Sequence, residues 1–109
     1  MIEYKIFKEV YDDIISGKKT IEFRMLNDKS KKIKKNDLIK FNVVDSDNYI
    51  VVRVINKYIY NNLEDLWSHK EILANTLTYT KEQFFEAFDN IFGEKMASNS
   101  KIVGIEFDK

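Results

Sequence analysis

The feature that most constrains the fold is the segment Tyr49–Tyr60, in which half of the residues are β-branched. Isoleucine and valine have few favourable side-chain rotamers and pack well on a pleated surface, so this composition favours a β-strand over a helix. Because the segment is also long, we expect it to form a strand at the centre of a sheet.

Local patterns predict further elements on both sides of this strand. We expect shorter strands at residues 20–25, Leu38–Val43 and Ile102–Phe107. We expect helices at residues 8–16, after Asn62, and at residues 80–92, where Thr80–Gln83 fits a capping box. A lysine-rich loop is predicted for residues 27–36 and a turn for Asp45–Asn48. The order of helix, three strands, helices and strand favours an α+β fold, a small mixed barrel, over an alternating βαβ sheet.

Apolar spacing indicates which sides of the helices are buried. The first helix places Val10, Ile14 and Ile15 on one stripe, and Gly17 would end it in a left-handed conformation. In the helix of residues 80–92, Phe84, Phe85 and Phe88 recur at helical spacing, and we expect these three rings to pack on the sheet. The helix after Asn62 is expected to turn Leu63, Leu66 and Trp67 inward.

Composition excludes several classes of site. The 109 residues predict a single domain, residues 1–109, and 44% of them are hydrophobic, which is enough for one core. Cysteine is absent and His69 is the only histidine, so we expect no metal site, no thiol chemistry and no cofactor. No apolar run reaches the roughly 20 residues of a membrane span, and the first residues lack a signal-peptide pattern. We therefore expect a cytoplasmic protein.

Charge is unevenly distributed along the chain. The formal net charge is zero, yet residues 18–40 hold nine cations and three anions, a local charge of +6. Such polarity can attract a polyanion to one side of a domain. Four lysines of this segment are candidates for an electrostatic collar around a binding site: Lys31, Lys32, Lys34 and Lys35. The alternative is an ordinary solvated lysine loop.

The densest group of chemically capable side chains lies between Ser16 and Arg24. On a strand, Thr20, Glu22 and Arg24 share one face, because side chains alternate with a period of two. Glu22 and Arg24 would form either a simple ion pair or the floor of a cleft, in which Arg24 binds a phosphate. Lys19 and the neighbouring Lys18 stand where the first helix joins this strand.

Gly17, Lys19, Glu22 and Arg24 have the spacing Gly-x-Lys-x-x-Glu-x-Arg, which resembles the signature of the ASCH domain family in its small, single-domain prokaryotic form. The resemblance extends over nearly the whole chain, through the preceding helix, the segment Ile33–Phe41 and the closing strand Ile102–Phe107. It implies a PUA-like mixed β-barrel with helices packed on one side. In this family a glycine is usual at position 36, and asparagine tolerates the same left-handed conformation.

The resemblance also implies a function, namely binding of RNA or of a nucleotide or nucleoside in a cleft at the motif. The residues expected to contact the ligand are the motif group and its surroundings: Gly17, Lys18, Lys19, Thr20, Glu22, Arg24, the four lysines of the collar, and Trp67 as an aromatic residue at the rim. One alternative function is a protein-interaction module in translation or transcription. The sequence does not define an oligomeric state.

The other alternative is an enzyme, because some small bacterial ASCH proteins remove the acetyl group from acetylated cytidine. Their proposed catalytic set is a lysine, a threonine and a distant glutamate. Aligned on the motif, the lysine corresponds to Lys19, the threonine corresponds to Glu22, and no carboxylate stands at Asn75 or Thr76. Lys19 and Glu22 are thus the candidate catalytic residues for a small amidohydrolase or nuclease. Without a hydroxyl nucleophile, we expect hydrolysis of acetylated cytidine to be absent or very weak.

Overall fold

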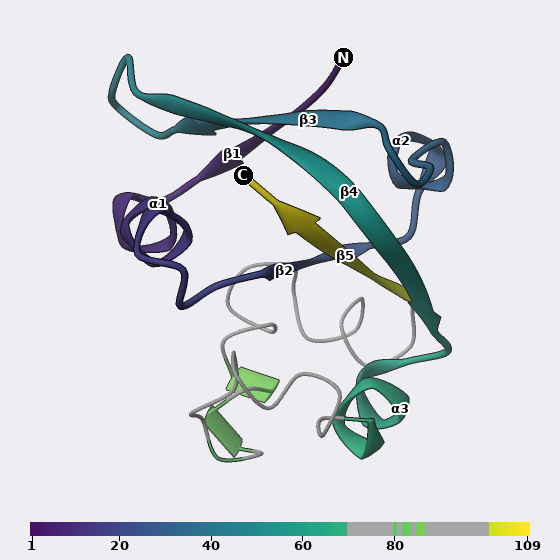
Figure 1. Cartoon of the computed structure of the whole chain (residues 1–109). Helices are drawn as coiled ribbons and strands as arrows, with labels where there is room; N and C mark the ends of the chain where they lie inside the picture. Colours follow the sequence, from purple (N-terminus) through teal and green to yellow (C-terminus); the bar gives the residue numbers. More distant parts are fainter. Residues whose placement is uncertain (70–79, 81, 84, 87–100) are drawn as a thin grey trace.

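The computed structural model describes residues 1–69, 80, 82, 83, 85, 86 and 101–109. In this part of the chain five strands form one sheet in the order β1-β3-β4-β5-β2, and the sheet curls into a half-barrel (Figure 1). The strands are β1 (Ile2–Ile6), β2 (Ile21–Met25), β3 (Leu38–Val43), β4 (Tyr49–Tyr60) and β5 (Ile102–Asp108). Three helices pack alongside: α1 (Lys8–Ile15), α2 (Asp28–Lys31) and α3 (Leu63–Ser68). The α+β fold predicted from the sequence is confirmed.

Strand β4 is the middle strand of the sheet, as its composition predicted. It pairs antiparallel with β3 along one side and with β5 along the other, with a bulge between Val54 and Asn56. Strand β1, which pairs in parallel with β3, was not predicted. The signal was present, because Ile2, Tyr4 and Ile6 alternate with charged residues. The segment is too short for that pattern to stand out.

The segment of residues 27–36, predicted as a lysine-rich loop, begins with a short helix. It contains α2, whose first turn is fixed by reciprocal hydrogen bonds between Asn27 and Ser30. The Ser30 amide donates to Asn27 Oδ1 at 3.0 Å, and the Asn27 amide donates to Ser30 Oγ at 2.9 Å. Asn36 then adopts φ = 75°, the left-handed conformation expected of it.

Two apolar clusters lie on opposite faces of the sheet. On β5, Val103 and Ile105 enter the cluster inside the half-barrel, whereas Ile102 enters a second cluster on the other face. Phe41 of β3 is fully buried in the inner cluster, and its ring lies 5.6 Å from that of Phe107. The second cluster includes Leu63 and Leu66 of α3, both buried as predicted.

The face of β2 that turns into the half-barrel is the polar one. Glu22 is opposite Ile105 in the pairing of β2 with β5, and Arg24 is opposite Val103. Residues directly opposite each other in a sheet point to the same side. Glu22 and Arg24 therefore point to the side of the inner cluster, while Ile21, Phe23 and Met25 pack in the second cluster.

Part of the predicted helix of residues 80–92 lies outside the described residues, including Phe84 and Phe88. The capping-box hydrogen bonds are present, from the Thr80 amide to Gln83 Oε1 and from the Gln83 amide to Thr80 Oγ1. Phe85 is half-buried against the second cluster. No helix among the described residues is long and apolar enough to cross a membrane.

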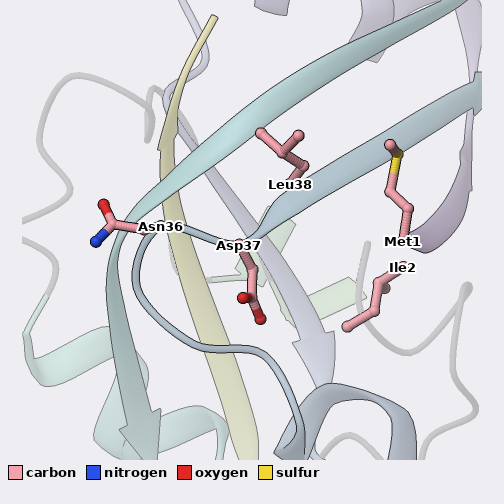
Figure 2. Close-up of a pocket in the computed structure, with 5 residues that line it drawn as sticks. All are labelled: Met1, Ile2, Asn36, Asp37 and Leu38. Carbon is pink, nitrogen blue, oxygen red and sulfur yellow. The ribbon is translucent and has the colours of Figure 1, made fainter.

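A hollow of about 450 Å³ opens at the start of β3. It is lined by Met1, Ile2, Asn36, Asp37 and Leu38 (Figure 2). In this view Met1, Ile2 and Leu38 lie on one side of the turn, and the amide of Asn36 points away from them.

Replacing Phe41 by alanine should lower the free energy of unfolding by about 3–5 kcal/mol, because the ring is fully buried and the surrounding cluster can only partly collapse. Phe7→Ala is the matched control, since the Phe7 side chain is 59% exposed; its effect should stay below about 0.5 kcal/mol. Urea unfolding monitored by circular dichroism measures both. Equal losses in the two variants would contradict the described core.

Candidate functional site

The motif begins where α1 ends. Gly17 adopts φ = 83° and turns the chain from the helix toward β2. The Lys19 amide donates to the carbonyl of Asp13 at 3.0 Å, which anchors the next residues to the end of α1. The side chain of Lys19 consequently starts beside the polar face of β2.

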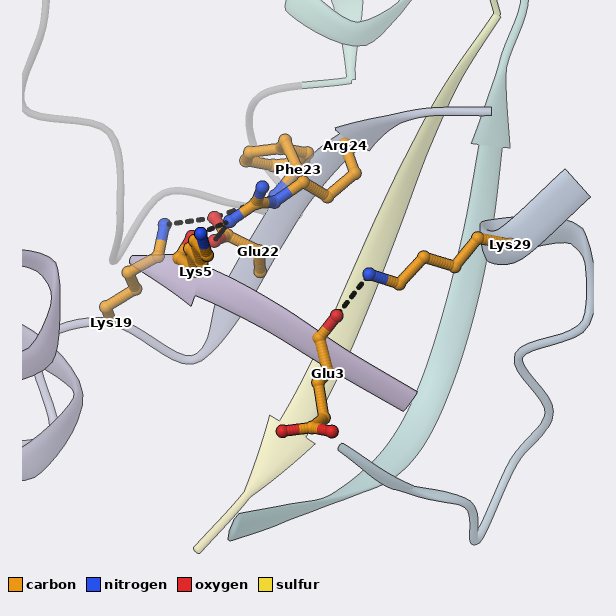
Figure 3. A network of polar contacts seen from close by, with 7 residues as sticks. All are labelled: Glu3, Lys5, Lys19, Glu22, Phe23, Arg24 and Lys29. Carbon is orange, nitrogen blue, oxygen red and sulfur yellow. Dashed lines mark hydrogen bonds and ion pairs between the residues drawn. The ribbon is translucent and has the colours of Figure 1, made fainter. Parts of the chain in front are cut away.

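Glu22 is the centre of the site, with a cation on each oxygen of its carboxylate (Figure 3). Lys19 Nζ lies 3.3 Å from Oε1, and an Arg24 guanidinium nitrogen lies 3.0 Å from Oε2. The Glu22 residue is only 8% exposed, whereas both cations keep about a fifth of their side-chain surface in solvent. The arrangement is a largely desolvated carboxylate between two partly solvated cations.

The protonation of Glu22 follows from these neighbours. Burial by itself would raise the pKa of the carboxyl group, because it penalises the charged form. The charges of Lys19 and Arg24, together with their hydrogen bonds, outweigh burial and lower the pKa of Glu22 below its ordinary value. Glu22 is therefore a carboxylate at neutral pH, and the ion pair expected from the sequence is present.

Arg24 and Lys29 connect the edge strand β1 to β2 and to the helix that follows β2. Strands β1 and β2 stand at opposite ends of the strand order, so neither is paired on its outer side in the described sheet. Arg24 of β2 donates to the carbonyl of Lys5 in β1 at 2.8 Å, and its guanidinium carbon lies 4.6 Å from the centre of the Tyr4 ring. Lys29 of α2 donates to the carbonyl of Glu3 and also lies over the Tyr4 ring, at 4.2 Å.

The remaining predicted residues lie in separate places. Lys18 and Thr20 are exposed at the junction of α1 and β2. Trp67 is half-buried on α3, where it packs against the second cluster. In Figure 1, α3 and the α1–β2 junction are far apart. The prediction that Trp67 borders a cleft at the motif stays a prediction.

The four lysines of the predicted collar, Lys31, Lys32, Lys34 and Lys35, are all exposed, and we call them the lysine surface. No ion pair involves any of them in the part of the chain that the structure describes. They follow β2, whereas Lys19 precedes it, and a five-residue strand spans about 15 Å. The carbonyls of Lys31 and Ile33 accept hydrogen bonds from Lys57 of β4, which holds the segment against the sheet.

Two features of this region were not predicted from the sequence. The hollow at the start of β3 joins residues 1 and 2 to residues 36–38, so no local pattern indicates it. The contacts of Lys29 and Tyr4 across the two sheet edges are equally non-local.

Comparison with known proteins agrees with this architecture. The model of the ASCH domain family matches residues 5–101. The chain belongs to the ASCH domain family. Comparison with curated proteins finds no match.

Solved structures of ASCH-like proteins share the fold. The crystal structure of hypothetical protein PH0355 is 25% identical, with a TM-score of 0.79 over 97% of this chain and 95% of that one. The solution structure of PF0455 from Pyrococcus furiosus is 26% identical, with a TM-score of 0.65 over 98% of this chain and 96% of that one. The ASCH protein from Zymomonas mobilis is 16% identical, with a TM-score of 0.66, and the match covers 98% of this chain but 66% of that one. The PUA-like fold implied by the motif is confirmed.

Replacing Glu22 by glutamine should destabilise the protein by about 1–3 kcal/mol at pH 7, because Lys19 and Arg24 lose their charged acceptor. Since the folded-state pKa of Glu22 is lowered, its stabilising contribution is complete above the ordinary carboxyl pKa and is lost as the pH falls through the lower folded value. The difference between wild type and variant should therefore shrink on acidification. Urea unfolding at a series of pH values between 7 and 2 measures this difference.

Glu9→Gln supplies the control, because Glu9 is an exposed carboxylate on α1. It should change stability by less than about 0.5 kcal/mol. A Glu22→Gln deficit that persists unchanged at the lowest pH would show that the loss does not come from the charge of Glu22.

Proposed function

We propose that this domain binds single-stranded RNA, and that the lysine surface on α2 and the following loop supplies most of the electrostatic attraction. The observation that carries the proposal is the contrast between two sets of cations. Lys19, Arg24 and Lys29 are engaged with protein acceptors, whereas the four lysines of the lysine surface are exposed and unpaired within the described chain.

An ammonium group with no protein partner binds a polyanion more favourably than one that already contacts a carboxylate. An RNA phosphate that approaches Lys19 or Arg24 meets the carboxylate of Glu22, which both cations already contact. A phosphate at the lysine surface displaces only mobile counterions, and their release favours binding. Membership of the ASCH family and the PUA-like fold agree with an RNA-binding role.

In this proposal the motif acts mainly through the fold. Glu22 orients Arg24 toward β1, and the strand that carries both residues leads directly into α2 and the lysine surface. Lys19 and Arg24 keep enough exposure to touch a nucleotide that extends beyond this surface. The contacts favour binding over hydrolysis, because the Lys19 ammonium is bound to a carboxylate and a threonine nucleophile does not stand at position 22.

Replacing Lys31, Lys32, Lys34 and Lys35 together by glutamine should weaken RNA binding and flatten its salt dependence. Each phosphate neutralised on a single strand contributes about 0.7 to the slope of log affinity against log salt, so four lost contacts should reduce the slope by up to about 3. Fluorescence anisotropy with a labelled oligonucleotide at three or more salt concentrations measures the slope.

The matched control replaces Lys5, Lys8, Lys101 and Lys109, which are also exposed, so the net charge changes equally. This variant should keep a slope close to that of wild type. Equal flattening in both variants would mean that only net charge matters. Flattening by Lys19→Gln and Arg24→Gln, with none from the four-lysine variant, would instead locate the polyanion at the motif.

A further inference from the structure

We propose that the hollow at the start of β3 receives one unpaired nucleobase that carries an exocyclic amino group, with the carboxylate of Asp37 as the acceptor. This inference rests on the proposed RNA-binding function and gives it a base preference. The hollow is lined by three apolar side chains and by the polar residues Asn36 and Asp37 (Figure 2).

The apolar side of the hollow offers a surface on which a flat base can pack. Met1 is 74% exposed and Leu38 is 48% exposed, so both present apolar surface to solvent. A volume of about 450 Å³ falls in the usual range of small-molecule sites, about 300–1,000 Å³. Covering Met1, Ile2 and Leu38 with a base would remove apolar surface from water, which favours binding without selecting any base.

Asp37 is held in place by its own turn. Its amide donates to the carbonyl of Lys34 at 3.0 Å, and its Oδ2 accepts from the Lys34 amide at 2.8 Å. Its carbonyl accepts from the Val54 amide at 2.9 Å, and the Asn36 amide donates to the Val54 carbonyl at 2.7 Å. These bonds tie the turn to β4, so little ordering is needed when a ligand binds.

The carboxylate has acceptor capacity left for a ligand. Within the described chain only Oδ2 of Asp37 takes part in a hydrogen bond, and a carboxylate offers about four lone-pair positions. A carboxylate accepts but does not donate, so the position that faces Asp37 favours an exocyclic amino group, such as cytosine N4, adenine N6 or guanine N2, over a carbonyl oxygen. Uracil presents a carbonyl oxygen where cytosine has its amino group, and two acceptors facing each other repel.

The hollow adjoins the lysine surface. The Lys34 carbonyl accepts from the Asp37 amide, the Lys34 amide donates to the Asp37 carboxylate, and Lys35 directly precedes Asn36. A strand whose phosphates contact these lysines can therefore place a base against Leu38 and Asp37. The phosphate contacts supply affinity, and the contact with Asp37 supplies the base preference.

Cytosine and uracil oligonucleotides provide the sharpest test, because the two bases have nearly the same shape. Wild type should bind an oligocytidine about tenfold more tightly than the oligouridine of equal length at fixed salt. Asp37→Asn keeps an oxygen for the Lys34 amide and converts the other position into an amino donor. This variant should lose the preference for cytosine or reverse it. Fluorescence anisotropy with both oligonucleotides, for both proteins, gives the four affinities.

Asp47→Asn is the matched control, because it removes the same charge at an exposed position in the turn between β3 and β4. It should strengthen binding of both oligonucleotides alike and leave their ratio unchanged. Equal affinities of wild type for the two oligonucleotides would overturn the base site while leaving the RNA-binding function in place. Absence of binding to either oligonucleotide would overturn the proposed function itself. If Asp37→Asn fails to fold, the ratio measured for wild type still decides.

Discussion

The buried carboxylate of Glu22 is the interaction on which the arrangement of this domain depends. A carboxylate in a largely desolvated position is unfavourable unless it is paired, and here both of its oxygens have a cationic partner. Each partner comes from a different local structure, Lys19 from the connection between α1 and β2 and Arg24 from β2 itself. Glu22 thereby fixes the direction of the Arg24 side chain, which reaches across to β1.

This connection addresses a general difficulty of open sheets. The outer edges of β1 and β2 carry backbone groups that the described sheet does not pair, and such edges favour unwanted association with other chains. The curl of the sheet brings the edges of β1 and β2 near each other. Side chains join the two edges, in place of backbone hydrogen bonds between the strands. Arg24 and Lys29 donate to the carbonyls of Lys5 and Glu3, and both cations also contact the Tyr4 ring. The cations of the motif are thereby largely used by the fold, which leaves the lysine surface for a polyanion.

Features that depend on a few consecutive residues were predictable from the sequence. The β-branched run gave the central strand β4, Asn62 gave the start of α3, and the left-handed conformations of Gly17 and Asn36 followed from residue type. Helix α2 was not predicted, because the segment was interpreted from its many lysines and not from the Asn27–Ser30 cap. The alternation on β2 also placed Glu22 and Arg24 on one face, where an ion pair was one of the two alternatives. Contacts between distant segments could not be predicted. No pattern of neighbouring residues indicates that Arg24 donates to the carbonyl of Lys5 or that Leu38 and Met1 line the same hollow.

Amide hydrogen exchange of Arg24→Met tests most directly whether the motif joins the two edges of the sheet. Methionine keeps much of the side-chain volume but cannot donate to the carbonyl of Lys5 or to Glu22. If the connection holds β1 in place, the amides of β1 should exchange faster in the variant than in wild type, while those of the central strand β4 stay protected. Unchanged protection of β1, or an equal loss of protection across all five strands, would contradict this role for Glu22 and Arg24.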